Sequence, residues 1–106
     1  MYRIRFHGRG GQGIKTASRI LGSALFAEGF EVQDAPRYGA ERRGAPIHAH
    51  VRADRKPVAE RGPIDHADLV VVADETLAQV PAAGVMAGLE NRSVLIIASA
   101  ENSETW

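Results

Sequence analysis

The spacing of apolar residues changes once near the amino end of the chain. Tyr2, Ile4 and Phe6 alternate with polar residues, which predicts a strand over residues 2–7 with one apolar face. Further on, apolar residues recur every three or four positions, which predicts an amphipathic helix that stops at Gly29. The residues of this apolar stripe are Ile14, Ala17, Ile20, Leu21, Ala24 and Leu25. The chain therefore opens with a strand, a glycine-rich turn and a helix.

Two shorter patterns predict strands in the middle of the chain. Residues 30–33 are predicted to form a strand that Pro36 ends, because proline lacks a backbone donor and restricts its predecessor. Over residues 47–54, apolar and polar side chains alternate without a break, which predicts a half-buried strand. A turn over 54–57 is followed by residues 58–60, which we expect to pair back as a short return strand and complete a hairpin.

Unbroken apolar runs dominate the second half of the chain. Residues 69–73 and 93–99 each contain such a run, which is typical of strands covered on both faces of a parallel sheet. Between them, Asp74 is placed to cap a short helix, and residues 84–89 are expected to add a helical turn. The whole pattern predicts a single α/β domain over residues 1–106. We expect a three-layer α/β/α arrangement with a mixed, mainly parallel sheet and a Rossmann-like start.

The charge of the chain is balanced overall and unevenly distributed. The formal net charge is zero, which argues against general affinity for nucleic acid. Residues 1–61 contain 12 Lys and Arg against 6 Asp and Glu, whereas residues 62–106 contain 1 Arg against 7 acidic residues. A basic first half suits a polyanionic ligand or an acidic partner surface. A second interpretation is that the two halves simply attract each other.

Cysteine usage and hydropathy limit the function further. The chain has no Cys, so it has no disulfide, thiolate nucleophile or iron–sulfur ligand of its own. No charged-then-apolar leader precedes Tyr2, and no apolar run of about 18 residues occurs. We therefore expect a cytoplasmic protein that is neither secreted nor membrane-spanning.

The glycine-rich turn between the first strand and the helix has a chemical use. Gly8, Gly10 and Gly13 match the pattern G-x-G-x-x-G in the strand–turn–helix context that this motif requires. Residues without a Cβ let backbone N–H groups approach a ligand, and the positive end of the helix dipole favours an anion such as phosphate. A tight turn that uses glycine for conformational reasons alone would show the same pattern. Asp34 lies where a ribose-binding acid stands in a dinucleotide-binding domain, so a stand-alone dinucleotide-binding module is an alternative.

Three segments taken together resemble a known family. They are RIRFHGRGGQG at residues 3–13, YGAERRGAP at 38–46 and LVVVAD at 69–74. In this combination and order they are similar to the gamma subunit of the 2-oxoacid:ferredoxin oxidoreductases, which act on pyruvate, 2-oxoglutarate, 2-ketoisovalerate or indolepyruvate. The resemblance extends from Arg3 to about Ser99.

The resemblance implies a partner-dependent role in a redox enzyme. The family catalyses oxidative decarboxylation of a 2-oxoacid to an acyl-CoA and passes the electrons to ferredoxin. Thiamine diphosphate with Mg²⁺ and the iron–sulfur clusters are held by partner subunits of the alpha, beta and delta type, which is consistent with a chain without Cys. The gamma-type chain is implied to handle coenzyme A within a hetero-oligomer. It is implied to carry no catalytic residue or metal ligand and to be inactive alone.

The resemblance also implies which residues contact coenzyme A. The glycine loop would offer backbone or side-chain donors to the pyrophosphate, and two arginines would pair with phosphate oxygens through their forked guanidinium groups. The implied residues are Gly8, Gly10, Gly11, Gln12, Gly13, Arg42 and Arg43. For the two arginines, an ion pair at a subunit interface is the alternative. Arg9, Lys15 and Thr16 are further candidates, with an interface contact or plain solvation as the other interpretation.

Three histidines on or beside predicted strands are interpreted as structural. His48 and His50 are two positions apart on one strand face and could form a metal pair, but no third ligand has a matching spacing. An exposed or interfacial strand face is the better interpretation. His7 faces away from Phe6 and is expected to form hydrogen bonds in the loop rather than to act in catalysis. A purely structural assembly subunit, whose glycine loop packs against a partner, is a third hypothesis.

The chain is shorter than the family that it resembles. Gamma chains of the family continue well past the strand that ends near Ser99, whereas this sequence stops at Trp106. We interpret it as the N-terminal part of a gamma-type domain, truncated at its C-terminus, or as an unusually short version. If the elements that normally follow are missing, part of the sheet is expected to expose an apolar face unless a partner covers it.

Overall fold

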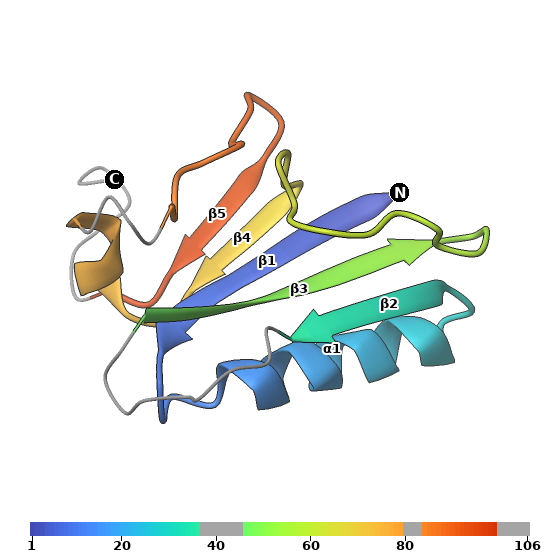
Figure 1. Ribbon diagram of the computed structural model, residues 1–106, viewed down its shortest axis with the longest axis horizontal. Coiled ribbons are helices and arrows are strands. Elements are labelled where there is room, and N and C mark those ends of the chain that lie inside the picture. The colour runs from blue at the N-terminus through green and yellow to red at the C-terminus, as the bar shows by residue number, and fades with distance from the viewer. Residues whose placement is uncertain (37–45, 80–83, 100–106) are drawn as a thin grey trace.

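The fold is built on one five-stranded sheet with a long helix along one face (Figure 1). The computed structural model describes residues 1–36, 46–79 and 84–99. Its elements are β1 (Tyr2–Arg9), α1 (Ile14–Ala27), β2 (Glu31–Pro36), β3 (Pro46–Asp54), β4 (Leu69–Val72), the 3-10 helix η1 (Glu75–Gln79) and β5 (Val94–Ile97). The strand order is β2-β3-β1-β4-β5, so the first strand lies at the centre of the sheet.

The pairing of the strands is mixed. Strand β1 pairs antiparallel with β3 and parallel with β4, while β2 pairs antiparallel with β3 and β4 pairs parallel with β5. The predicted α/β class and the mixed sheet are confirmed. Parallel pairs do not predominate, because the chain returns through β2 and β3 on one side of β1 before it crosses to β4 on the other side.

The two faces of the sheet carry separate apolar clusters. One cluster lies under α1 and contains Ile4, Phe6, Ile14, Ala49 and Val51, with Leu21, Leu69 and Val71 among the residues packed against it. The other lies on the opposite face and contains Ile64, Ala67, Val70, Val72, Leu77 and Val85. Among the described residues, this second face is covered by η1 and by turns rather than by an α-helix. The predicted third layer is therefore thinner than expected.

The ends of α1 follow from glycine conformation. Gly13 is the N-cap residue with φ +78°, and its carbonyl accepts the N–H of Ala17 at 2.9 Å. At the other end Gly29 has φ +94°, a left-handed conformation that glycine adopts without strain. The N–H groups of Gly29 and Phe30 donate to the carbonyls of Phe26 and Leu25, which forms a Schellman motif. The predicted helix and its stop are confirmed.

Two predictions for the middle of the chain are wrong. Strand β2 does not break before Pro36, which pairs with Ala49 at the end of the strand. Proline is tolerated there because β2 is an edge strand with no further strand beyond it among the described residues. Residues 58–60 form no return strand. Both edges of β3 are already occupied by β1 and β2, so no edge is left for a hairpin partner.

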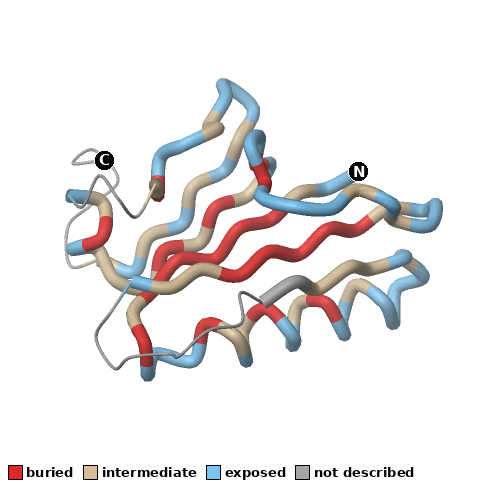
Figure 2. The backbone as a smooth tube through the Cα atoms, viewed as in Figure 1, coloured by how far each residue is buried: buried red, intermediate tan, exposed pale blue. Residues whose placement is uncertain are grey.

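Burial also differs from expectation on two strands. Strand β3 was expected to be half-buried, yet His50 and Arg52 on its polar face are as buried as Val51 on the other, because the chain after β3 folds back across that face. Strand β5 was expected to be covered on both faces, yet Val94 and Ile96 are 54% and 52% exposed. In Figure 2 the backbone of β1 and β3 is mostly red, the colour of buried residues, whereas β5 alternates between exposed pale blue and intermediate tan.

The connection between β4 and β5 begins as predicted. The Asp74 carboxylate accepts the backbone N–H of Thr76 at 3.0 Å and so caps η1, which is a 3-10 helix. The segment around residues 84–89 forms hydrogen-bonded turns, with the Ala87 N–H donating to the Gly84 carbonyl. None of the helices among the described residues has the length and apolar character needed to cross a membrane.

Candidate functional site

The glycine loop lies at the carboxyl edge of the two parallel strands β1 and β4. Gly8 is still part of β1, opposite Ile47 of β3, and the chain then turns through Gly11 and Gly13 into α1. Both of these later glycines have left-handed backbone conformations, with φ values of +92° and +78°. The carboxyl ends of neighbouring parallel strands are where open α/β sheets form ligand crevices. The loop is therefore in the position that a ligand site requires.

Gly8 and Gly13 of the motif have different structural roles. A Cβ on Gly8 would lie 2.4 Å from Cγ1 of Ile14, so this residue is glycine because the helix start packs directly against the strand. A Cβ on Gly13 would meet no atom of the described residues within 4 Å, so that part of the chain leaves the space beside it open. Gly8 thus fits the conformational interpretation of the motif, whereas the side of the loop at Gly13 has room for a ligand.

The start of α1 has the electrostatic features of an anion site. The N-cap is a glycine without a side chain, and the described first turn contains no acidic residue. The first N–H groups of a helix have no partner within the helix, and they carry the positive end of its dipole. Lys15 is half-buried and Thr16 is exposed in the same turn. An anionic group placed here would meet backbone donors at close range.

A network of side chains ties the glycine loop to the loop after β4. The backbone N–H of Arg9 donates to Oε1 of Gln12 at 2.7 Å, and Nε2 of Gln12 donates to the Asp74 carboxylate at 3.0 Å. The Arg9 guanidinium forms an ion pair with Asp74 at 3.3 Å and a hydrogen bond with Thr76 at 3.0 Å. Hydrogen bonds from Thr76 and Gln12, together with the charge of Arg9, lower the pKa of Asp74. The carboxylate is therefore ionised and holds the loop.

This network assigns roles that sequence patterns did not reveal. Arg9 was a candidate for ligand or interface contact, and its guanidinium is engaged within the chain by Asp74 and Thr76. The backbone N–H of Gln12 donates to the Arg9 carbonyl at 3.1 Å, so this residue shapes the loop as well as facing the site. The sequence signals for Asp74 were its value as a helix cap and its place at the end of the segment LVVVAD. Its contact with the glycine loop depends on the adjacency of β1 and β4.

The two predicted phosphate-binding arginines, Arg42 and Arg43, lie outside the described residues. The structure does fix where their segment rejoins the sheet. Pro46 at the start of β3 pairs with Arg9 at the end of β1, and Ile47 pairs with Gly8. The described chain therefore resumes, at Pro46, beside the glycine loop.

A cluster of polar side chains lies on the face of the sheet opposite α1. His7 is the cross-strand neighbour of His48, and their ring centroids are 6.0 Å apart. The rings of His48 and His50 stack at 5.0 Å. A cavity of about 210 Å³ lies among these side chains, with Arg5, Pro63, Ile64 and Gly84 as its other walls. His7 is the third histidine that the spacing of His48 and His50 did not reveal, because only the strand register brings it there.

The geometry of the histidine cluster does not make a metal site. Within residues 1–36, 46–79 and 84–99, no group of three His, Cys, Asp or Glu side chains is placed to hold a metal ion. Nε2 of His7 accepts a hydrogen bond from Nε of Arg5 at 2.7 Å. Burial, and then the nearby charge of Arg5, lower the pKa of His7 to about 3, so the ring is neutral. His7 forms a hydrogen bond, as predicted, but its partner is Arg5 on the same strand and not the glycine loop.

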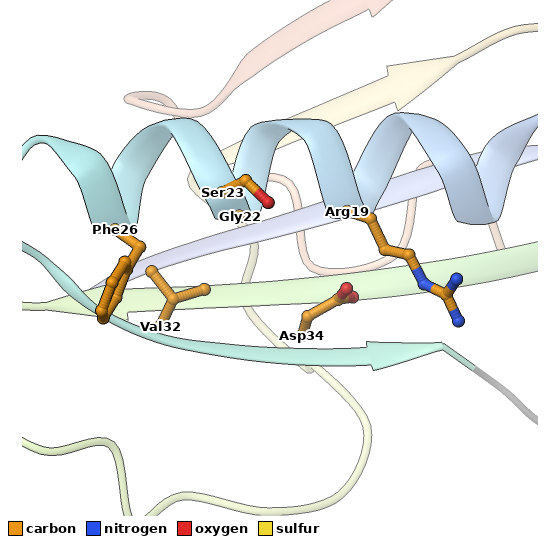
Figure 3. A pocket seen from close by; sticks show the side chains of 6 residues that line it. All are labelled: Arg19, Gly22, Ser23, Phe26, Val32 and Asp34. Carbon is orange, nitrogen blue, oxygen red and sulfur yellow. The ribbon is translucent and has the colours of Figure 1, made fainter.

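Asp34 lies in a separate groove between α1 and β2. The groove measures about 510 Å³, and its lining residues are Arg19, Gly22, Ser23, Phe26, Val32 and Asp34 (Figure 3). Burial raises the pKa of Asp34, and the hydroxyl of Ser18 lies 3.5 Å from its carboxylate. In a dinucleotide-binding domain, the ribose-binding acid stands at the end of a strand that lies next to the first strand and runs parallel to it. Here β3 separates the two strands, so Asp34 lacks that relation to the glycine loop.

Sequence comparisons relate nearly the whole chain to one family. Residues 3–105 match the family model described as pyruvate ferredoxin/flavodoxin oxidoreductase. The chain is 45% identical over 104 residues to the pyruvate/ketoisovalerate oxidoreductases common subunit gamma of Pyrococcus furiosus, with 98% of this chain and 55% of that relative covered. It is 46% identical over 97 residues to the pyruvate synthase subunit PorC of Methanothermobacter thermautotrophicus, with 92% and 53% covered. The chain thus spans about half the length of the curated relatives it matches.

Solved structures show the same fold. The pyruvate oxidoreductase subunit PORC of Thermotoga maritima superposes with a TM-score of 0.77 at 38% identity, covering 98% of this chain and 53% of that chain. The 2-oxoglutarate:ferredoxin oxidoreductase of Magnetococcus marinus, a structure with 2-oxoglutarate, coenzyme A and succinyl-CoA bound, superposes with a TM-score of 0.69. The sequence identity to that enzyme is 20%, and 96% of this chain covers 17% of it, so the likeness is one of fold.

Proposed function

We propose a function from one premise, that the chain belongs to the pyruvate ferredoxin/flavodoxin oxidoreductase family. The resemblance carried by three sequence segments is thereby confirmed. We infer that the chain is a gamma-type part of a 2-oxoacid:ferredoxin oxidoreductase and helps to bind coenzyme A. Partner subunits carry out the oxidative decarboxylation of the 2-oxoacid to an acyl-CoA and pass the electrons to ferredoxin. Relatives named as a gamma subunit and as PorC support the subunit role.

The observation that carries the coenzyme A proposal is the open start of α1 beside the glycine loop. Coenzyme A is a polyanion, and its pyrophosphate needs several N–H donors at close range. The glycine N-cap, the first turn without acidic residues in the described chain and the space beside Gly13 meet that need. Asp74 is the nearby negative charge, and its ion pair with Arg9 offsets it. Among the described residues, the carboxylate next to the loop is thus already paired with a cation, which favours the binding of an anion.

The basic segment before β3 supports the same site. Arg43 precedes Pro46 by three residues, and Pro46 pairs with Arg9 beside the glycine loop. A fully extended chain spans at most about 3.6 Å per residue, so Arg43 lies within roughly 11 Å of Pro46. An arginine side chain can bridge much of that distance. This short connection supports our proposal that Arg42 and Arg43 pair with phosphates held at Gly11, Gln12 and Gly13.

We assign a positioning role to this chain and the redox chemistry to its partners. As the family resemblance implies, we assign the iron–sulfur clusters, the thiamine diphosphate and its Mg²⁺ to partner subunits of the alpha, beta and delta type. The absence of Cys from this chain is consistent with that assignment for the clusters. The glycine loop and the basic segment hold the phosphates of coenzyme A. Holding that end directs the thiol toward the acyl group that forms on the partner subunits.

The proposal predicts that Arg42→Ala combined with Arg43→Ala raises the KM for coenzyme A in the assembled enzyme. A hydrogen bond to a charged group contributes about 1.5–3 kcal/mol, so we expect a rise of about tenfold or more. The kcat at saturating coenzyme A and the KM for the 2-oxoacid should change little, because neither arginine touches the reacting carbon. Steady-state kinetics on the complex purified with its partner subunits measures these constants.

A matched control for this experiment is Lys56→Ala combined with Arg92→Ala. Both residues are exposed cations. Lys56 follows the end of β3 and Arg92 precedes the start of β5, so both lie at the end of the sheet away from the glycine loop. The control removes the same charge and should leave the KM for coenzyme A unchanged. An unchanged KM in the Arg42/Arg43 variant would contradict the proposal and favour a purely structural assembly subunit.

A further inference from the structure

The cavity among His7, His48 and His50, on the sheet face opposite α1, contains a buried positive charge. This histidine cavity is also lined by Arg5, whose side chain is 4% exposed. The Arg5 guanidinium donates to Nε2 of His7 and otherwise to backbone carbonyls, including that of Ile64. All of these acceptors are neutral. They satisfy N–H groups of the guanidinium but leave its charge in place.

The neighbouring arginines on this sheet face are balanced by acids, whereas Arg5 is not. Arg3 and Arg52 both contact the Glu60 carboxylate. A hydrogen bond to Glu60, with the charge of Asp68 in addition, raises the pKa of Arg3. Among the described residues no carboxylate contacts Arg5, and burial lowers its pKa without any acid to raise it. This face therefore has an excess of one positive charge, and that charge lies at the histidine cavity.

The walls of the cavity carry donors that suit an oxyanion. A buried cation without a counter-charge is costly, so the site favours an anion that supplies one. Nη1 of Arg5 has two N–H groups and a single acceptor among the described residues, the Ile64 carbonyl at 3.2 Å. His48 and His50 stack at 5.0 Å on the same wall, and an imidazole donates one N–H when neutral and two when protonated. Guanidinium and imidazole groups thus line one small space.

The size and charge of the cavity restrict the anion to a small monovalent one. At roughly 30 Å³ per water molecule, a volume of about 210 Å³ holds on the order of seven waters. One negative charge balances Arg5, whereas a dianion such as phosphate would leave a charge of the other sign. Pro63 and Ile64 form an apolar wall on which a short hydrocarbon chain can pack. We propose that the histidine cavity binds a short-chain monocarboxylate. This inference does not depend on coenzyme A binding.

The four histidines of the chain supply the readout for a direct test. The NMR signals of their Cε1–H groups, assigned from single His→Gln variants, are followed at pH 7 while sodium propionate is added to the 106-residue chain. His66 lies outside the cavity with a side chain that is 73% exposed, so it is the internal control. Propionamide has the shape of propionate without its charge, inorganic phosphate supplies a dianion, and sodium chloride matches the ionic strength.

We expect propionate to shift the signals of His48 and His50 in a saturable way, with a dissociation constant on the order of 1 mM, and to leave His66 unchanged. Propionamide and sodium chloride should shift none of these signals, and phosphate should bind more weakly than propionate. Propionate shifts that do not saturate would overturn the proposal. So would propionamide, chloride or phosphate acting on His48 and His50 as strongly as propionate does.

Two cavity variants test the residues themselves. Arg5→Gln removes the charge, and His50→Gln removes one imidazole and leaves the hydrogen bonds of Arg5 in place, so it decides the test if Arg5→Gln does not fold. Each folded variant should weaken propionate binding by about tenfold, which corresponds to one charge-assisted hydrogen bond. His66→Gln is the matched control and should change the binding by less than about twofold. Unchanged binding in either folded cavity variant would overturn the proposal.

Discussion

At the scale of single residues, the buried pair of Arg5 and His7 determines the hydrogen bonding and the protonation state on the sheet face opposite α1. The Arg5 side chain is 4% exposed and donates to the carbonyls of Ile64 and Val85 as well as to His7. One guanidinium thus joins the central strand to two segments that are far apart in the sequence. Because its Nε proton goes to Nε2 of His7, that ring nitrogen must stay unprotonated in the folded chain.

The first prediction is that His7 makes stability depend on pH. Its pKa is about 3 in the fold and about 6.5 in an unfolded chain, so between these values only the unfolded state binds the proton. The free energy of unfolding should fall as pH drops through this window, by up to about 1.4 kcal/mol per pH unit from this group. His7→Gln keeps an acceptor for Arg5 and cannot titrate. Urea unfolding at pH 7.5, 6 and 5 should show a shallower pH dependence for the variant, and identical slopes would refute the assignment.

The second prediction separates the structural glycine of the loop from the others. Gly8→Ala places a Cβ 2.4 Å from Cγ1 and 2.5 Å from Cδ1 of Ile14, a residue that is 2% exposed. Overpacking of this kind costs about 1–3 kcal/mol of unfolding free energy. Gly22→Ala is the matched control, because its Cβ meets Val32 at an ordinary 3.4 Å and alanine favours the helix.

Thermal and urea unfolding of both glycine variants measures the difference. We expect Gly8→Ala to destabilise the fold and Gly22→Ala to be neutral or stabilising. The loss from Gly8→Ala should shrink when it is combined with Ile14→Ala, since the two residues are in contact. A fully additive double variant would show that the close approach of helix and strand is not the cause.

At the scale of elements, the segment after β3, residues 55–63, lies across the polar face of the sheet and is held there by hydrogen bonds and ion pairs. The Glu60 carboxylate accepts from Nη2 of Arg3 at 2.8 Å and from Nε of Arg52 at 2.9 Å. Hydrogen bonds from Arg3 and Arg52 lower the pKa of Glu60 to about 2. The Arg52 guanidinium is 1% exposed and also donates to Gln33 on β2. One carboxylate therefore balances a buried cation that links two strands to this segment.

The third prediction is that Glu60→Gln lowers the melting temperature and speeds proteolysis within residues 55–63. The amide cannot neutralise the buried Arg52, and a buried charge without its partner is costly. Below pH 4.5 the advantage of the native residue should fade toward pH 2, since its carboxylate must then be protonated. Glu90→Gln is the control, because its pair with His66 is exposed at 64% and 73% and contributes little. Equal melting shifts in the two variants at pH 7 would count against this role.

Local sequence patterns predicted most helices and strands correctly, but they did not predict which strands lie next to one another in the sheet. The alternation in β1, the stripe of α1 with its Gly29 stop and the apolar run of β4 are properties of short segments. Whether a strand lies at the edge or the centre depends on the whole topology. Local sequence therefore predicts a strand break at Pro36 and a return strand over residues 58–60, and the structure has neither. At the site, the glycine motif could be predicted, whereas its tie to Asp74 and the histidine cluster arise only from strand adjacency and register.

At the scale of the whole molecule, charged residues are distributed unevenly along the chain, and several of them pair with one another within the fold. Arg9 forms an ion pair with Asp74, and Arg3 forms one with Glu60. The first half of the chain is basic, and the segment with Arg42 and Arg43 rejoins the sheet at the glycine loop. On β5, Val94 and Ile96 are 54% and 52% exposed. Both features suit a component of a larger enzyme.

The most direct test is a two-dimensional ¹H–¹⁵N NMR titration of the 106-residue chain with coenzyme A, with NAD as the comparison. Weak binding is sufficient, because amide shifts report on contacts residue by residue. We expect coenzyme A to shift the amides of residues 10–16 and of Arg42 and Arg43, and to leave the groove around Asp34 unchanged. NAD should produce smaller shifts. Coenzyme A shifts that avoid both segments, or tight NAD binding that Asp34→Ala abolishes, would contradict the proposed role.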